Sequence, residues 1–321
     1  MRHMEAFHKG NSQREFHQRF ALQSAMEYLM TYGWAILIIA VVLAALFELG
    51  VFNPMTFAPK APPGSCQVVR PEGVGTTNFI SLSGECNGEL PQYVAQFNGQ
   101  NSYISVANVI QQDQVSSGST GKITITAWAL ASSAPYGTNQ PNILYYGGSS
   151  VCTTPYTTLE MMILGTNPIG SFTILQCSNM PMGDPNSITI GKWFFYATTF
   201  NGIVFNGYLG YDSSLYNNTV LGISNVILPG ASPLSIGGPG PFDSYWNGEI
   251  ANVQIYDTAL SSNGISALYQ EGIGGAPIKI QSLVGWWPLN GNANDYSGND
   301  NNGAATGVIY TNNWYSGYSA P

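Results

Sequence analysis

Residues 28–47 form an uninterrupted run of twenty residues without a charged side chain, YLMTYGWAILIIAVVLAALF. As an α-helix, this run would be about 30 Å long, which matches the hydrocarbon core of a bilayer. Tyr28, Tyr32 and Trp34 gather at its N-terminal end, where aromatic rings suit a membrane–water interface. The sequence therefore predicts a long hydrophobic helix over residues 23–50 that is inserted in a membrane.

Basic side chains precede this run. Four of the nine Lys and Arg residues and all three His residues lie within residues 1–22. The positive-inside rule places this leader in the cytoplasm and the chain after Leu49 outside. A cleaved secretory signal peptide is one alternative, although its apolar core is usually only about 7–15 residues long. An uncleaved single-span anchor is the other.

Glu27 lies at the entrance of the apolar run, where a carboxylate is costly unless it has a partner. The segment QSAMEYLMTYGWAILIIAVV, residues 23–42, resembles the start of mature archaeal type IV pilins. In that family a prepilin peptidase removes a basic leader, and a Glu stands fifth in the mature chain. Cleavage between Leu22 and Gln23 would make Glu27 fifth. The resemblance implies that Glu27 pairs with the amine of Gln23 in a neighbouring subunit, so that two opposite charges offset each other's burial.

The cleavage site departs from the pilin pattern. The family prefers Gly or Ala before the cut, whereas this chain has Leu22 preceded by Ala21. Cleavage after Ala21 would make Glu27 sixth. Cleavage after Gly10 would make Glu15 fifth, but polar residues follow that position.

Four prolines within residues 51–64 end the helix and favour an extended linker. The domain that follows, residues 65–321, contains four cysteines. An even number in an exported chain suggests two disulfides, for which three connectivities are possible. The simplest connectivity joins neighbours in sequence, Cys66 with Cys86 and Cys152 with Cys177.

The exported part has few charged side chains. After residue 50 there are five basic residues, thirteen acidic residues and no histidine. The negative net charge argues against nucleic-acid binding. The absence of histidine excludes Ser–His and Cys–His catalysis and histidine-ligated zinc from this part.

Residues 65–321 consist of short strand-like segments separated by Gly, Asn, Pro and Ser. Polar and apolar residues nearly alternate over residues 123–129, and residues 193–197 are continuously apolar, as in a strand buried on both faces. One helix is expected, with Ser261 or Ser262 as its N-cap and Gly272 at its end. Its predicted buried face consists of Ile265, Leu268 and Tyr269. The fold class is therefore mostly β, an antiparallel sandwich or barrel.

The succession of segments from FNGQNSYISV at 97–106 to WNGEIANVQIYDTALSSNGISALY at 246–269 is similar to LamG-like domains of the concanavalin A-like jelly-roll superfamily. This resemblance implies two antiparallel sheets packed face to face, with a concave face that often binds sugars. Related sandwich glycosidases need two carboxylates roughly 5–9.5 Å apart. No Glu-x-Asp-x-x-Glu run occurs, and Glu249 and Asp257 lie too far apart in sequence to replace it. We therefore expect no enzymatic activity.

Residues 283–299 resemble the segment that opens a LamG-like domain, yet they follow the segment that closes one. Residues 300–321 are too few to build a second sandwich of about 100 residues. We therefore expect a circularly permuted domain in which this segment returns to its usual place and buries one or both of Trp286 and Trp287. Donation of the strand to a neighbouring subunit is the alternative.

Site candidates lie mainly in loops. We expect Tyr245 and Trp246 to stack on sugar rings and Asp243 and Asn247 to bond sugar hydroxyls. Candidate calcium ligands are the scattered carboxylates Asp243, Asp295 and Asp300. The first LamG-like motif has amides where the family has aspartates, namely Asn98, Gln100 and Asn101. The sequon Asn217-Asn218-Thr219 predicts N-glycosylation, and we expect it in a turn.

These patterns predict a structural subunit of an extracellular type IV pilus-like filament that displays a lectin-like domain with a role in adhesion. The alternative is a single-span surface protein with a glycan-binding domain. Expected partners are further copies of the chain through the N-terminal helix, prepilin peptidase, the membrane before assembly, and surface glycans. The expected location is the cell surface, with a membrane-inserted precursor.

Overall fold

The computed structural model describes residue 30 and residues 32–48, 58–107, 109, 121–133, 141–146, 159–164, 171–175, 188–220, 233–239 and 244–321. The chain divides into two compact units, Met1–Ala58 and Pro59–Pro321, and each is described by itself. Residues 59–64, expected as the end of the linker, belong to the second unit. The expected assembly and processing residues, Leu22, Gln23 and Glu27, lie outside the described residues.

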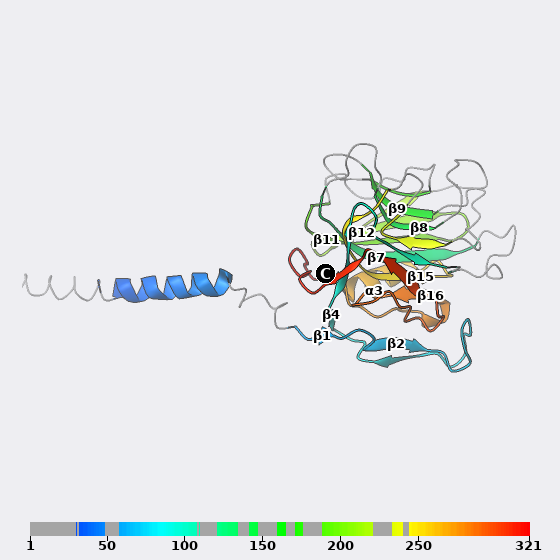
Figure 1. The fold of residues 1–321 in the computed structure, drawn as a ribbon, viewed down its shortest axis with the longest axis horizontal. Coiled ribbons are helices and arrows are strands. Elements are labelled where there is room, and N and C mark those ends of the chain that lie inside the picture. Colours follow the sequence, from blue (N-terminus) through cyan, green and yellow to red (C-terminus); the bar gives the residue numbers. More distant parts are fainter. Residues whose placement is uncertain are drawn as a thin grey trace, which may run out of the picture. The chain divides into compact units, whose positions relative to one another are not determined.

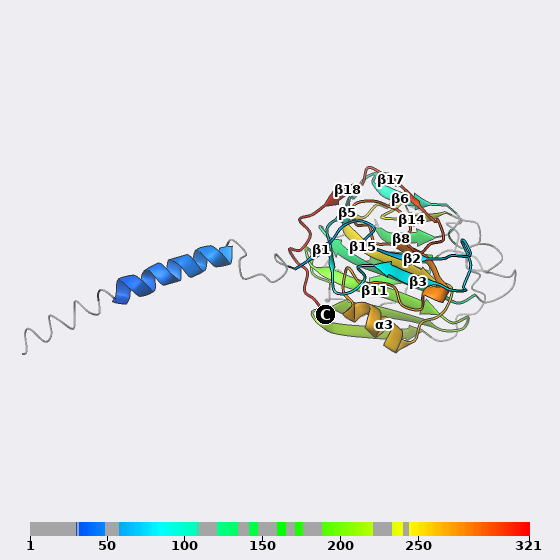
Figure 2. The ribbon, with the colours of Figure 1, turned by 90° about the horizontal axis from the view of Figure 1, so that it is seen from below.

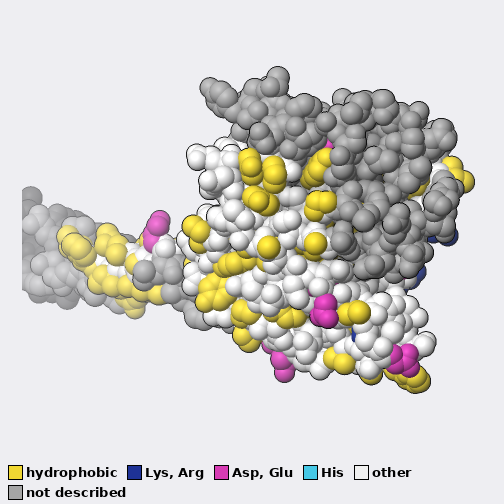
Figure 3. Space-filling view, turned by 45° about the vertical axis from the view of Figure 1, so that its right-hand side comes forward, with side chains coloured by type: hydrophobic (Ala, Val, Ile, Leu, Met, Phe, Trp, Pro, Cys, Tyr) yellow, Lys and Arg dark blue, Asp and Glu magenta, His cyan; other side chains and the backbone are white. Residues whose placement is uncertain are grey.

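In the first unit, residues 32–48 form an α-helix, drawn in blue in Figure 1. Large apolar side chains are exposed all along this helix, and they appear as yellow atoms in Figure 3; they include Trp34, Ile36, Leu37, Ile38, Ile39, Val41, Val42, Leu43 and Phe47. Among the described residues, no helix is long and apolar enough to span a membrane. The first residues of the expected span, Tyr28 and Leu29, are not among them.

The second unit is a sandwich of antiparallel sheets. Its six-stranded sheet, as far as the structure describes it, has the order β10 (Ser171–Leu175), β9 (Leu159–Leu164), β8 (Asn142–Tyr146), β14 (Leu234–Ile236), β6 (Tyr103–Val106) and β17 (Gly303–Thr306). Its eight-stranded sheet has the order β13 (Ser214–Val220), β12 (Phe205–Tyr211), β11 (Trp193–Phe200), β7 (Ile123–Ala131), β15 (Asn247–Tyr256), β5 (Val94–Asn98) and β18 (Ile309–Thr311), and β16 (Leu283–Trp287) also pairs with β15. Two short ribbons complete the unit: β1 (Lys60–Ala61) with β4 (Leu90–Pro91), and β2 (Cys66–Val69) with β3 (Ser81–Gly84).

The two large sheets share one hydrophobic core. Ile104 and Leu144 from the six-stranded sheet pack in the same cluster as Ile125, Phe194 and Val253 from the eight-stranded sheet. Each of these side chains alternates along its strand with one that points away from the core. The expected antiparallel sandwich is therefore confirmed, and Figure 1 shows its two sheets as stacked layers.

A third layer covers the other face of the eight-stranded sheet. Trp128 points away from the sandwich core and stacks on Tyr269 of the helix, with ring centres 5.8 Å apart and planes at 19°. Phe195 and Tyr318 join this second aromatic cluster at 5.6 Å from Tyr269 and 5.5 Å from Trp128, respectively. Every residue of β7 and β11 is buried as a result. This explains the continuous apolar run of β11, which the sequence predicts to be buried on both faces.

The helix α3 (Ser262–Gln270) begins and ends where the sequence predicts. Ser261 is its N-cap, and the Ser261 hydroxyl accepts a hydrogen bond from the backbone N–H of Gly264 at 3.3 Å. Beyond its C-terminus, Gly272 has a φ of 78°, a left-handed conformation that glycine adopts without strain. Its buried face is the predicted one, made of Ile265, Leu268 and Tyr269. A short 3₁₀ helix, η1 (Ile280–Ser282), leads from this layer back to the sheet.

The C-terminal segment completes both sheets of its own chain. β16 pairs antiparallel with β15, β17 with β6, and β18 with β5. Both tryptophans of β16 are buried; Trp287 lies in the core between the sheets, and its Nε1 donates a hydrogen bond to the carbonyl of Asn301 at 2.9 Å. β16, the first part of the segment 283–299, thus pairs with β15 of the same chain.

The two ends of the second unit are fastened to each other. The ammonium of Lys60 in β1 lies 4.9 Å from the ring centre of Trp314. The Trp314 indole N–H donates to the carbonyl of Pro91 in β4, the parallel partner of β1, at 3.2 Å. Burial lowers the pKa of Lys60. A cation over an indole face is attractive, so this contact stabilises the junction between the start and the end of the domain.

We expect Trp287→Ala to lower the free energy of unfolding by about 3–5 kcal/mol, because it empties a fully buried site between the sheets. Ile309→Ala is the matched control, since Ile309 is 64% exposed on the edge strand β18. Chemical denaturation of both variants would measure the difference. Equal, small effects would mean that β16 does not contribute to the core.

Candidate functional site

The outward face of the six-stranded sheet carries a row of polar side chains that crosses four strands. Glu160 pairs with Tyr145, Tyr145 with Ser235, and Ser235 with Ser105. Directly opposed residues of neighbouring strands have Cβ atoms about 4.5–5.5 Å apart. The four side chains therefore form one continuous line, which we call the outer row.

Alternation along the strands decides which way the outer row faces. The residues next to it, Ile104, Leu144 and Ile236, belong to the core between the sheets. Because successive side chains of a strand point to opposite faces, the outer row points away from the core. Asn142 lies on the same side of the sheet. The register of β8 and β9 shifts between Asn142 and Leu144, so Asn142 pairs with Met162. That position lies two residues after Glu160 on β9, so Asn142 faces the same way as Glu160.

Two buried oxygen atoms on this face have unused hydrogen-bonding capacity. Glu160 and Asn142 are each 1% exposed. In the described part of the chain, neither Glu160 Oε1 nor Asn142 Oδ1 has a hydrogen-bond partner. An unpaired buried polar atom costs about 1–3 kcal/mol. A ligand that brings hydroxyl or N–H donors to this face would remove that cost.

Burial also changes the protonation of the Glu160 carboxyl. Removal from water disfavours the charged form and raises the pKa of Glu160 from 4.5 to about 7. Near neutral pH the group is therefore present in both forms, as a donor when protonated and as an acceptor when ionised.

Two tyrosines adjoin the outer row. Tyr103 lies two residues before Ser105 on β6 and faces the same way. Its ring centre is 6.4 Å from that of Tyr245, and the two ring planes are inclined at 48°. Both side chains are partly exposed. The face thus combines phenol rings, hydroxyls, a carboxyl and an amide.

Residues 98–266, more than half of the chain, match the family model of the concanavalin A-like lectin/glucanases superfamily. The chain belongs to this superfamily. No curated protein matches its sequence.

Solved structures with a similar fold have low sequence identity to the chain. The heptameric SAP-like pentraxin from Limulus polyphemus is 15% identical, with 70% of this chain and 96% of that chain covered and a TM-score of 0.45. The LG1–3 region of the laminin α2 chain is 13% identical, with 56% of this chain and 34% of that chain covered and a TM-score of 0.39. The CBM40 of Ruminococcus gnavus IT-sialidase is 11% identical, with 56% and 97% covered and a TM-score of 0.39.

Within this lectin/glucanase sandwich, the predicted sugar-stacking role of Trp246 is wrong. Trp246 is 1% exposed and packs in the core, and its Nε1 donates to the carbonyl of Glu249 at 3.3 Å. Asn247 is exposed, and its Nδ2 donates to the Ser133 hydroxyl at 2.8 Å. Asp243 lies outside the described residues. Of the described members of the predicted set, Tyr245 is the one beside the outer row, through its contact with Tyr103.

The predicted calcium ligand Asp295 bonds instead to its own loop. Its carboxylate accepts hydrogen bonds from the backbone N–H groups of Trp286, Ser297 and Asn301 and from the Ser297 hydroxyl. Asp300 is exposed at a left-handed position, with a φ of 59°. In the part of the chain that the structure describes, no three or more His, Cys, Asp or Glu residues are grouped so that they could hold a metal ion.

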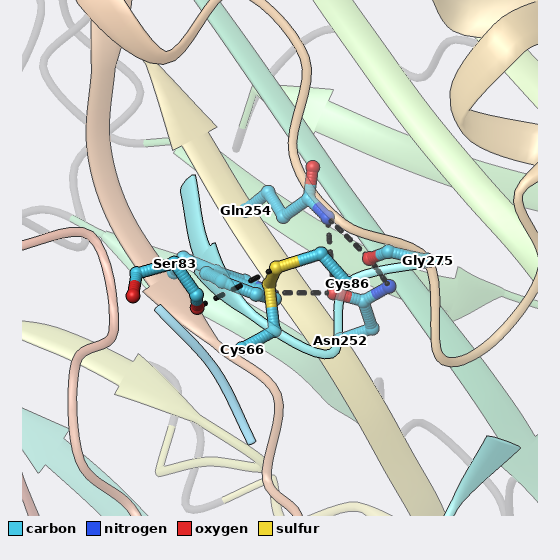
Figure 4. Close-up of a disulfide and its surroundings, with 7 residues drawn as sticks. Cys66, Ser83, Cys86, Asn252, Gln254 and Gly275 are labelled. Carbon is cyan, nitrogen blue, oxygen red and sulfur yellow. Dashed lines mark hydrogen bonds between the residues drawn. A yellow bond between two sulfur atoms is a disulfide. The ribbon is translucent and has the colours of Figure 1, made fainter. Parts of the chain in front are cut away.

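One of the expected disulfides, Cys66–Cys86, is present at the base of the β2–β3 ribbon. Figure 4 shows it near Asn252 and Gln254 of β15, and both cysteines line a small cavity together with Asn252. Cys152 and Cys177 lie outside the described residues.

The predicted glycosylation residue Asn217 is exposed, but the prediction of a turn is wrong. Asn217 lies within the strand β13, where it pairs with Tyr208 of β12. The reason is that Asn-rich polar segments are compatible with an edge strand, whose exposed face needs no apolar residues.

A separate cavity of about 210 Å³ lies between the β2–β3 ribbon and the C-terminal segment, and Arg70 lines it. Its guanidinium donates hydrogen bonds to backbone carbonyls of both regions: Thr76, Ile280, Leu283 and Ser297. Arg70 therefore fastens the ribbon to the sandwich, and its donors are directed at the protein rather than at the cavity.

Sequence reasoning missed Glu160, Asn142, Tyr145 and Ser105. One indication was present, since Glu160 is the only charged residue of the otherwise apolar strand LEMMIL. A carboxylate in such a strand has to be desolvated or face a site, which marks it for attention.

We expect Glu160→Gln to raise the free energy of unfolding at pH 8 by ~1–3 kcal/mol and to leave it unchanged near pH 4. Because the folded-state pKa of about 7 exceeds the ordinary 4.5, the folded protein holds a proton that the unfolded chain has lost between these values. Stability therefore falls as the pH rises from 4.5 to 7 and stays low above 7. Denaturation series at both pH values would measure this. A gain of equal size at pH 4 would contradict the explanation.

Proposed function

We propose that this chain is a subunit of an extracellular type IV pilus-like filament and that its sandwich binds a glycan at the outward face of the six-stranded sheet. The observation that carries the binding proposal is the pair of buried oxygens, Glu160 Oε1 and Asn142 Oδ1, without partners in the described chain. They lie beside partly exposed tyrosines in a lectin/glucanase sandwich.

Sugar chemistry fits this face. Each hydroxyl of a sugar is a donor and an acceptor, so one ring can satisfy several of the groups in the outer row. The C–H surface of the same ring can pack on the exposed part of the Tyr103 or Tyr245 ring. Hydroxyls on the edge of the ring would then lie over the partly exposed Tyr145 and Ser105, in the row that leads to the buried Glu160.

We assign binding rather than hydrolysis to this face. Among the described carboxyls, Glu160 and Glu249 are the two whose pKa burial raises to about 7. Glu249 adjoins the core residue Ile250 on β15 and so points outward from the eight-stranded sheet. Packed sheets lie about 10 Å apart, and the two side chains point in opposite directions, so they do not suit a pair that flanks one glycosidic bond.

Glycan binding can be tested with the full chain on an array of neutral, amino and acidic oligosaccharides. We expect Glu160→Ala and Tyr103→Ala to weaken binding of any recognised glycan about tenfold or more, because each removes one polar contact or stacking surface. Matched controls exist on the other sheet: Glu249→Ala, a carboxyl with a similarly raised pKa, and Tyr216→Ala, an exposed tyrosine. Equal losses in variants and controls would contradict a site on the outer row.

The filament proposal is supported by the first unit. Residues 32–48 form a helix whose large apolar side chains are exposed. A helix that is apolar all round has to be covered by lipid or by other helices. We propose that a prepilin peptidase cuts before Gln23, that the precursor helix is held in the membrane, and that mature helices bundle into the filament core.

In the filament, we expect Glu27→Gln to abolish or strongly reduce assembly while export continues, because the neighbouring amine of Gln23 would lose its counter-charge. Glu48→Gln at the other end of the helix is the matched control. Electron microscopy of cell surfaces measures assembly, and mass spectrometry of the native N-terminus tests cleavage. Normal filaments in Glu27→Gln cells would rule out the assembly role.

The alternative is a single-span surface protein with the same glycan-binding face. It is favoured by the basic leader and the apolar run alone, without any role for Glu27. Retention of residues 1–22 in the native protein, with no filaments, would support it.

A further inference from the structure

β13 is an edge strand with an open side. It ends the eight-stranded sheet, and all seven of its residues pair with β12 without a shift in register. In the described chain no strand pairs with its other side. As far as the described residues go, that side has a row of N–H and C=O groups without a strand partner, and such a row can template pairing with another chain.

The other sheet ends are protected by being short. β18 has three residues, β17 has four and β10 has five. β13 is longer, and its sequence SLYNNTV contains no charged residue, no proline and no bulge, the devices that usually block an edge. Its composition of Asn, Thr, Tyr and Val without charge is also typical of segments that form stacked sheets.

β13 has another feature that could block its edge, a glycosylation sequon. Asn217 begins the sequon Asn217-Asn218-Thr219 in the middle of the strand. Its side chain is exposed. It pairs with Tyr208, whose hydroxyl is 3.1 Å from that of Ser262 at the start of α3, so Asn217 lies on the face that α3 covers. Figure 2 shows α3 alongside the outermost strands of this sheet.

We propose that Asn217 carries an N-linked glycan and that this glycan keeps copies of the chain from pairing through β13. The proposal rests on the proposed function in one respect, namely that the domain is exported. A bulky, hydrated group in the middle of the seven-residue strand prevents the close approach, about 4.8 Å, that a neighbouring strand needs.

The modification is a group transfer. The donor is a glycan joined through its anomeric carbon to a lipid-linked phosphate. The Asn217 amide nitrogen forms a bond to that carbon, the bond between the carbon and the phosphate oxygen breaks, and the lipid phosphate leaves with the electron pair. The proton lost by the amide passes to a base of the transferase, and no oxidant or reductant is required.

The test compares four full-length variants purified from the native exporting cells. Asn217→Gln and Thr219→Ala remove the sequon, and Asn218→Gln is the matched control that keeps it. Asn217→Lys removes the glycan but places a charge on the edge. Glycopeptide mass spectrometry should find the glycan in the parent and Asn218→Gln, and in neither of the first two variants.

The oligomeric state of detergent-solubilised protein, measured by light scattering, is the second readout. We expect Asn217→Gln and Thr219→Ala to form larger species with slowed hydrogen exchange in β13, while Asn218→Gln and Asn217→Lys stay like the parent. An unmodified Asn217 in the parent, or Asn217→Gln protein as monodisperse as the parent, would overturn the proposal. Mass spectrometry of the N-terminus in the same samples measures leader removal independently of the glycan. Failure of the glycan proposal can therefore be distinguished from failure of the filament proposal.

Discussion

The eight-stranded sheet is buried on both faces, and the rest of the domain follows from that constraint. A sheet with apolar side chains on two sides needs a second layer on each of them. The six-stranded sheet covers one side and completes the core that contains Phe194 and Val253. On the other side, α3 and the chain's last residues cover Trp128 and Phe195. The six-stranded sheet has one face in this core and carries the outer row on its other face.

The parts of this fold that local sequence controls are predictable. The apolar run of β11 and the capped, one-sided pattern of α3 agree with the structure because propensity, periodicity and capping act over a few residues. The order of segments predicts the sandwich. Within β11 and α3, the residues that the sequence pattern predicts to be buried are buried.

The outer row could not be predicted in this way. Its members lie at positions 105, 145, 160 and 235, and only the register of four strands brings them together. For Trp246 the sequence predicts exposure, because its loop-like context contains Asn and Gly. The residue is buried instead, since a large ring gains most from burial. Whether a ring at a strand end turns inward depends on the volume available between the sheets, and a single sequence contains no direct record of that volume.

Polar order in this charge-poor domain comes from hydrogen bonds between side chains and the backbone rather than from ion pairs. In the described chain the one ion pair, Lys192–Asp212 at 3.8 Å, is exposed and contributes little. Loops are held instead by side chains that bond to the backbone: Asn98 Oδ1 accepts from the N–H groups of Gln100, Asn101 and Ser102. Such bonds between neutral groups are scarcely screened by salt, so the domain should keep its shape over a wide range of ionic strength.

The use of residues 283–311 in both sheets has a consequence for biosynthesis. β5 and β6 are made early, yet their outer neighbours β18 and β17 are among the last segments to be synthesised. Because contacts between such distant segments set the pace of folding, the sandwich cannot close while the chain is still being made. An exported chain would therefore emerge with open strand edges and finish folding only after translocation, so the time between emergence and closure is the period in which it depends most on chaperones.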